Sequence, residues 1–179
     1  RHVNSDSLSA DGLSGRPGNI LDLHLPEASP SRADLEIEEA IYRFKGDGRE
    51  GMSALELGCA PGGASSALLA RGLRVTGVDP QYMAPSVFSH PRFTSIRKET
   101  RHLTAEDLKR VNPDWLVMDM SIAPLEALDQ LSYALSLLVK NFGPDLRLRG
   151  GFLTIKMNDW DFVSSIPLYL KRIGQIGFR

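Results

Sequence analysis

The sequence predicts one α/β domain of Rossmann-like fold, with a mostly parallel sheet and helices on both faces. Three observations support this. Apolar segments of strand length alternate with segments of helical length along most of the chain. A glycine-rich turn follows the first apolar segment, at Gly58–Gly63. The second apolar segment ends on a carboxylate, Asp79. This order of strand, turn, helix, strand and acid builds a nucleoside pocket at the carboxyl ends of the strands.

The elements follow in order. Residues 1–30 are rich in Ser, Gly, Pro and Asp and predict an irregular arm or linker, which leaves 31–179 as the folded domain. Ser31 followed by Asp34 resembles a capping box and predicts a helix that starts there. Strands are predicted near 53–58, 73–79, 93–97, 114–119 and 150–157, and further helices near 62–71, 82–89, 104–110, 124–142 and 160–174.

Composition narrows the class of protein. The chain has 179 residues, of which 42% are hydrophobic and 24% charged, as in a soluble globular domain. One cysteine suits a reducing compartment, and no apolar run reaches the ~18 residues of a membrane span, so we expect a cytoplasmic protein without membrane contact. The four histidines show no metal-ligand spacing, and no metal is predicted. The oligomeric state stays open.

The glycine turn predicts the ligand. Its spacing, Gly58-x-x-x-Gly62-Gly63, departs from the G-x-G-x-x-G of dinucleotide sites, and no Lys or Arg stands in it to meet a phosphate. An acidic turn of this kind suits a ligand that carries a cationic amino acid and a ribose, which is S-adenosylmethionine (SAM). The alternative is a tight turn on a generic α/β sheet. The predicted cofactor-binding residues are Glu56, Gly58, Cys59, Ala60, Pro61, Gly62, Gly63, Asp79, Glu99 and Asp119.

Two charged residues close later apolar strands. Asp119 follows Trp115–Met118, and Lys156 follows Phe152–Ile155. We expect both to open onto the same crevice as Gly58, since the carboxyl ends of parallel strands share one edge. A charge at the end of a buried strand is costly unless it is paired or used. Lys156 is therefore a candidate base for a hydroxyl acceptor, oriented by Asp119. The alternative is a structural ion pair.

Several motifs together resemble one enzyme family. They are "LGCAPGG", "VTGVDP", "WLVMDM", "GGFLTIKM" and, upstream, "SRADLEIEEA". In these segments the chain resembles the FtsJ/RrmJ-like methyltransferases, above all the RlmM-like branch that methylates ribose 2′-hydroxyls of ribosomal RNA. The resemblance covers about residues 29–178. It implies a SAM cofactor, an RNA substrate, and a Lys-Asp-Lys-Glu tetrad in which Asp119 is the Asp and Lys156 the second Lys.

The chain departs from that tetrad at two positions. The first Lys falls on Glu36, which we therefore count among the catalytic candidates, and the final Glu would lie on or after a strand beginning near Phe178. We expect a truncated C-terminus for this reason. An anionic Glu36 would favour protonated Lys156. Either the acceptor needs no base, or another cation such as Arg32 or Lys45 replaces the lysine, or activity is lost.

The acceptor stays open at this point. A formal charge of −1 is low for a free-standing RNA-binding domain, which is usually basic. Two alternatives to an RNA enzyme remain: a methyltransferase for small molecules or natural products on the same fold, and an inactive module that still binds SAM.

Overall fold

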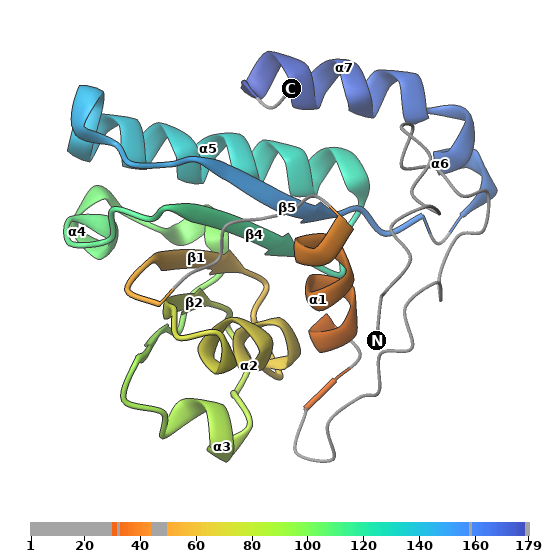
Figure 1. Ribbon diagram of the computed structural model, residues 1–179. Coiled ribbons are helices and arrows are strands. Elements are labelled where there is room, and N and C mark those ends of the chain that lie inside the picture. Colours follow the sequence, from red (N-terminus) through yellow and green to blue (C-terminus); the bar gives the residue numbers. More distant parts are fainter. Residues whose placement is uncertain (1–29, 32, 44–49, 158, 178–179) are drawn as a thin grey trace, which may run out of the picture.

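The computed structural model describes residues 30–31, 33–43, 50–157 and 159–177. The predicted arm at residues 1–30 lies almost wholly outside this part. Five strands form one parallel sheet in the order β3-β2-β1-β4-β5, which confirms the predicted fold class (Figure 1). The strands are β1 (Ser53–Leu57), β2 (Arg74–Val78), β3 (Phe93–Ile96), β4 (Trp115–Asp119) and β5 (Gly150–Thr154).

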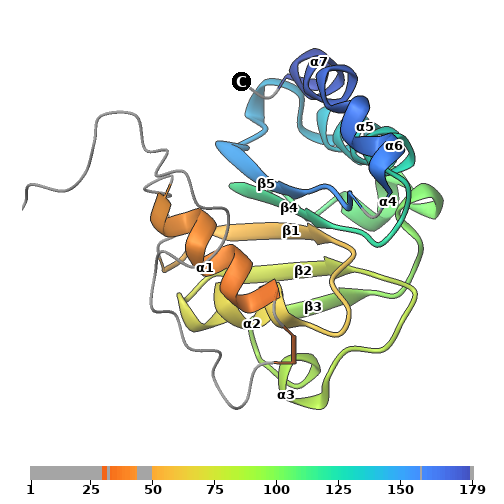
Figure 2. The ribbon, with the colours of Figure 1, turned by 90° about the vertical axis from the view of Figure 1, so that its right-hand side faces the viewer.

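Helices cover both faces of the sheet (Figures 1 and 2). On one face lie α1 (Ala33–Arg43), α2 (Gly63–Ala70) and the short α3 (Pro85–Phe88). On the other lie α4 (Ala105–Leu108), α5 (Pro124–Phe142), α6 (Trp160–Ser164) and α7 (Ile166–Ile176). Two 3₁₀ turns, Thr100–His102 and Gly143–Asp145, complete the described elements. None of the helices in this part of the chain has both the length and the apolar character of a membrane span.

Alternation along the strands produces two separate cores. Leu55 and Leu57 of β1 pack with Leu116 of β4 against α5, whose residue Leu128 is fully buried. Ala54 belongs to the other core, with residues of α1 and α2. Because side chains of a strand point alternately to the two faces, a buried central sheet needs apolar residues at nearly every position. The β1 strand meets this requirement at three of its five residues; the exceptions are Ser53 at its start and the buried Glu56.

The predicted helices 82–89 and 104–110 are the shorter α3 and α4. Two further elements, near the end of the described chain, also differ in extent. The predicted strand 150–157 ends at Thr154, because its neighbour β4 ends at Asp119, the residue paired with Thr154. Residues 155–157 therefore leave the sheet. The predicted helix 160–174 is two helices, α6 and α7, that meet at Ser165. Pro167 stands in the first turn of α7, where its missing N–H costs nothing, whereas inside a continuous helix it would break a hydrogen bond.

Candidate functional site

The glycine turn lies against the end of β4. Gly58 has φ +82°, and a Cβ on it would lie 2.6 Å from the carbonyl oxygen of Asp119. Gly62 has φ +117° and precedes α2, and a Cβ there would lie 2.9 Å from a methyl carbon of Val87. Both positions require glycine, for the left-handed backbone and for the close approach. The turn is thereby fixed beside Asp119, as the sequence predicts.

The carboxylate of Asp79 ties two loops together. Its Oδ2 accepts a hydrogen bond from the backbone N–H of Ala60 at 3.1 Å, and its Oδ1 accepts one from the N–H of Gln81 at 2.8 Å. The side chain is half-buried. Each carboxylate oxygen has a second lone pair. Asp79 can therefore position the turn and still accept hydrogen bonds from a ribose diol.

Glu56 lies beneath the turn, with only 1% of its surface exposed. Its Oε2 accepts a 2.5 Å hydrogen bond from the hydroxyl of Ser65 in α2. Burial raises the pKa of Glu56 to about 8, and the negative charges of Asp119 and Asp79 act in the same direction. Its predicted contact with the cofactor stays a prediction. Its position suits an electrostatic effect through the turn better than a direct contact.

Asp119 and Lys156 form an ion pair of 2.5 Å between Oδ1 and Nζ. Their side chains are 19% and 28% exposed, so both are partly accessible to solvent at the carboxyl edge of the sheet. Lys156 lies two residues beyond the end of β5 and reaches back to the end of β4. Asp119 is thus in contact with both halves of the site, through its backbone with Gly58 and through its side chain with Lys156.

The remaining predicted residues lie further from this ion pair. Glu36 is exposed on α1, and no ion pair joins it to Lys156 or Asp119 among the described residues. Glu99 follows β3 and pairs with Arg101 at 2.5 Å. Cys59 is buried against Gly77, with its Sγ 3.5 Å from Met83 Sδ, and burial raises the pKa of the thiol. A thiol in this state is a packing group and no nucleophile.

Sequence reasoning missed two features of the site. Ser65, the partner of Glu56, stands nine positions away with no distinguishing pattern. Tyr82 comes shortly after Asp79 and is 75% exposed. The guanidinium carbon of Arg97 lies over its ring, 3.8 Å from the ring centroid. An aromatic residue in the loop after the acidic strand end was the available signal for this cation–π contact.

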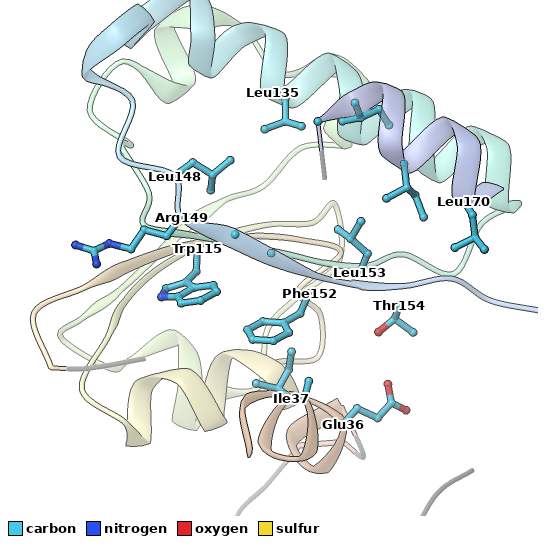
Figure 3. Close-up of a pocket in the computed structure, with 16 residues that line it drawn as sticks. Glu36, Ile37, Trp115, Leu135, Leu148, Arg149, Phe152, Leu153, Thr154 and Leu170 are labelled. Atoms are coloured by element: carbon cyan, nitrogen blue, oxygen red, sulfur yellow. The ribbon is translucent and has the colours of Figure 1, made fainter. Parts of the chain in front are cut away.

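A hollow lies elsewhere, along the edge of β5 that pairs with no strand among the described residues. It measures about 1120 Å³ and has mostly apolar walls that include Trp115 and Phe152, whose rings stack with centroids 5.5 Å apart (Figure 3). Figure 3 shows Glu36 and Thr154 together at one end of it. No other predicted site residue lines this groove. Its walls include Gly150, Gly151, Gly177 and the carboxylate of Glu36, but neither the glycine turn nor the strand-end carboxylates Asp79 and Asp119. The candidate site therefore remains at the glycine turn.

The residues of the crevice fit a SAM ligand. The carboxylates of Asp79 and Asp119 are both close enough to Glu56 for their negative charges to raise its pKa. Such an environment favours a ligand with positive charge. Two glycines hold the turn close to Asp119 and to Val87, where a Cβ would not fit. Among the described residues, no group of three or more His, Cys, Asp and Glu side chains could hold a metal ion. The fold and site define the class of SAM-dependent methyltransferases.

Comparison with known proteins supports this class and narrows it. The family model of the FtsJ-like methyltransferases matches residues 30–172. The chain therefore belongs to the FtsJ-like methyltransferase family, which confirms the resemblance and the enzyme class that the sequence predicts. Two crystal structures share the fold. One, described as a hemolysin from Lactococcus lactis, has a TM-score of 0.62 at 19% identity and covers 85% of this chain and 77% of that one. The other, fibrillarin from Aeropyrum pernix with bound S-adenosyl-L-methionine, has a TM-score of 0.51 at 18% identity, with 78% and 64% covered.

Curated relatives carry the name ribosomal RNA large subunit methyltransferase M. The protein from Laribacter hongkongensis is 37% identical over 118 residues, which are 60% of this chain and 31% of that protein. The protein from Alkalilimnicola ehrlichii is 38% identical over 122 residues, 62% of this chain and 32% of its own length. The chain thus spans about a third of the length of the curated relatives it matches.

Proposed function

We propose that this protein transfers the methyl group of SAM to a ribose 2′-hydroxyl of ribosomal RNA, in the compartment where ribosomes are assembled, the cytoplasm. The observation that carries the proposal is the Asp119–Lys156 ion pair, which meets the glycine turn at the carboxyl edge of the sheet. The names of the curated relatives support ribosomal RNA as the acceptor.

Each residue has a defined role in this proposal. Gly58, Gly62 and Asp79 hold the cofactor, whose sulfonium supplies an electrophilic methyl group. Asp119 fixes the Nζ of Lys156 by the ion pair, so that the lysine is positioned before the acceptor arrives. Once Nζ has released a proton to solvent, Lys156 can accept the proton of the acceptor hydroxyl, whose oxygen would take the methyl group that SAM supplies when bound. The proton ends on Nζ and leaves to solvent through the accessible side of the crevice.

Glu36 sets the efficiency of this step. The family places the first lysine of the tetrad at this position, and a neighbouring cation favours the neutral form of a lysine base. Glu36 offers the opposite charge at the end of the groove near Thr154 (Figure 3). Transfer by this chain should therefore be slow. Glu36→Lys should accelerate it by on the order of tenfold to a hundredfold, the lower range of a general-base contribution.

The test is incorporation of radiolabelled methyl groups from SAM into ribosomal RNA, with nuclease digestion to locate the label on ribose. Lys156→Ala should abolish transfer and leave SAM binding intact. Lys140→Ala, at an exposed lysine in the last turn of α5, is the matched control and should transfer normally. Label that persists in Lys156→Ala would refute the assignment of the base.

The comparisons do not favour a small-molecule acceptor or an inactive SAM-binding module. The same assay separates them from the proposal. Label in a small-molecule extract but not in RNA would support the first, and SAM binding without transfer in either the natural chain or Glu36→Lys would support the second.

A further inference from the structure

A second hollow lies at the opposite, amino-terminal edge of the sheet, away from the crevice. It measures about 360 Å³ and is formed by the beginnings of β1, β2 and β3 and by the segments that lead into β4 and β5. The side chains that matter for its chemistry are Arg74, Thr76, Arg92, Thr94, Arg110 and Arg147. Four guanidinium groups from four different segments thus border one small space.

The positive charge of the hollow is only partly neutralised. Among the described residues, no carboxylate lines it. Asp114, whose side chain is 7% exposed, lies behind it and is 3.5 Å from Arg147 and 3.6 Å from Arg149. Glu50 lies at 4.0 Å from Arg92. In the part of the chain that the structure describes, Arg74 and Arg110 have no acidic partner, although the whole chain has a net charge of −1.

The fold accounts for some of these arginines but not for all. Arg147 donates to the carbonyl of Asn112 and to Ser53, so it fastens the segment before β5 to its neighbours. Arg74 makes one exposed bond, to the carbonyl of Gly51. Arg110 is exposed and has no hydrogen bond or ion pair among the described residues. Like charges gathered without a structural partner raise the energy of the folded state, unless an anion binds there.

The chemistry of the lining matches a phosphate. A guanidinium presents a planar fork of N–H donors that fits two phosphate oxygens, and threonine hydroxyls are common further donors to phosphates. Thr76 and Thr94 are neighbours on paired strands and supply those hydroxyls at the floor of the hollow.

We propose that this hollow binds the phosphodiester backbone of the RNA substrate, on the far side of the sheet from the site of methyl transfer. The identity of the polyanion rests on the proposed function. A five-residue strand at about 3.3 Å per residue separates the two edges by roughly 15 Å. A single nucleotide in the crevice cannot reach both, whereas a folded RNA that wraps around the edge of the domain can. The hollow therefore contributes to the binding of folded RNA and not to that of short oligonucleotides.

The experiment compares salt-dependent RNA binding by the natural chain and by the double variant Arg74→Gln/Arg110→Gln. Folded ribosomal RNA fragments and short oligonucleotides are used side by side. The control, Lys171→Gln/Arg172→Gln, removes the same charge from exposed positions on α7. For folded RNA, the hollow variant should lose on the order of tenfold in affinity at low salt, and its slope of log K against log salt should fall by about 1 to 2. Short oligonucleotides should bind equally to all three proteins.

Each other outcome overturns the proposal. Equal affinity and slope for the hollow variant and the control would show that the hollow makes no phosphate contact with RNA. Competition by inorganic phosphate that is lost in the variant while RNA binding stays unchanged would assign a site for free phosphate instead. SAM binding reports folding, and if the double variant does not fold, Arg110→Gln alone gives the same comparison. Failure of the proposed function can be distinguished from failure of this inference. In that case no methyl group would be transferred to RNA, while the slope of RNA binding against salt would be unchanged.

Discussion

Replacing Glu56 with glutamine tests the electrostatics of the crevice through protein stability. The folded-state pKa of Glu56 is about 8, against 4.5 for the ordinary side chain. Between these values the native protein holds a proton that the unfolded chain has released, so the free energy of unfolding falls as the pH rises. The rate of loss approaches 1.4 kcal/mol per pH unit. Between pH 5 and pH 8, Glu56 alone should therefore remove about 3 kcal/mol of stability.

Glutamine keeps the shape and the oxygen that accepts the hydrogen bond from Ser65, but it has no proton to lose. Glu56→Gln should be the more stable protein at pH 8, and its advantage should shrink as the pH falls towards 5. Urea unfolding at pH 5, 6, 7 and 8 measures the difference. Glu106→Gln is the control, since that carboxylate is exposed and paired only with Lys109. If the natural chain and Glu56→Gln lose stability in parallel, the carboxyl group of Glu56 is ionised throughout and the reasoning fails.

Three further predictions follow from the same site and core. A cationic ligand beside Glu56 favours its charged form, so SAM binding at pH 7 should release a proton; calorimetry in buffers of different ionisation enthalpy would detect it, and equal heats in all buffers would contradict it. Gly58→Ala should destabilise the fold by about 1–3 kcal/mol and weaken SAM binding, because its Cβ would lie 2.6 Å from the Asp119 carbonyl; a variant with an unchanged denaturation midpoint would show that the turn can move. Leu128→Ala, at a fully buried position of α5, should cost about 2–5 kcal/mol by urea unfolding with SAM affinity unchanged in the folded protein, and a cost under 1 kcal/mol would mean that the core collapses around the gap.

The sequence predicted most of the fold because its signals were local. Most of the strands are largely apolar segments bounded by turns, and α5 was predicted with its observed limits, Pro124–Phe142, since a proline and a glycine mark its two ends. Where the prediction failed, the cause was a partner distant in the sequence. The end of β5 depends on where β4 stops, and periodicity within 150–157 carries no such information.

The candidate site was likewise predictable where the signal was local or topological, and not where it depended on distant partners. Strand ends could be predicted to share an edge, so the meeting of Asp119 with Lys156 was foreseeable from topology. The burial of Glu56 was not foreseeable. An acidic residue before a glycine turn predicts a ligand contact whether its side chain faces the ligand site or the protein interior. Its serine partner comes from the first turn of α2. The arginines of the hollow are scattered from Arg74 to Arg147, and only the parallel pairing of the strands collects them at one edge.

The open side of β5 has a consequence for any laboratory preparation of this chain. Among the described residues β5 pairs only with β4. Its sequence, Gly150–Thr154, contains no charged residue and no proline, the residues that protect edge strands from pairing with another chain. A strand of a second molecule can pair with β5 at this edge, which would join the sheets of the two molecules. Light scattering over a dilution series should precede every binding titration, since self-association through this strand would mimic cooperativity and distort each fitted affinity.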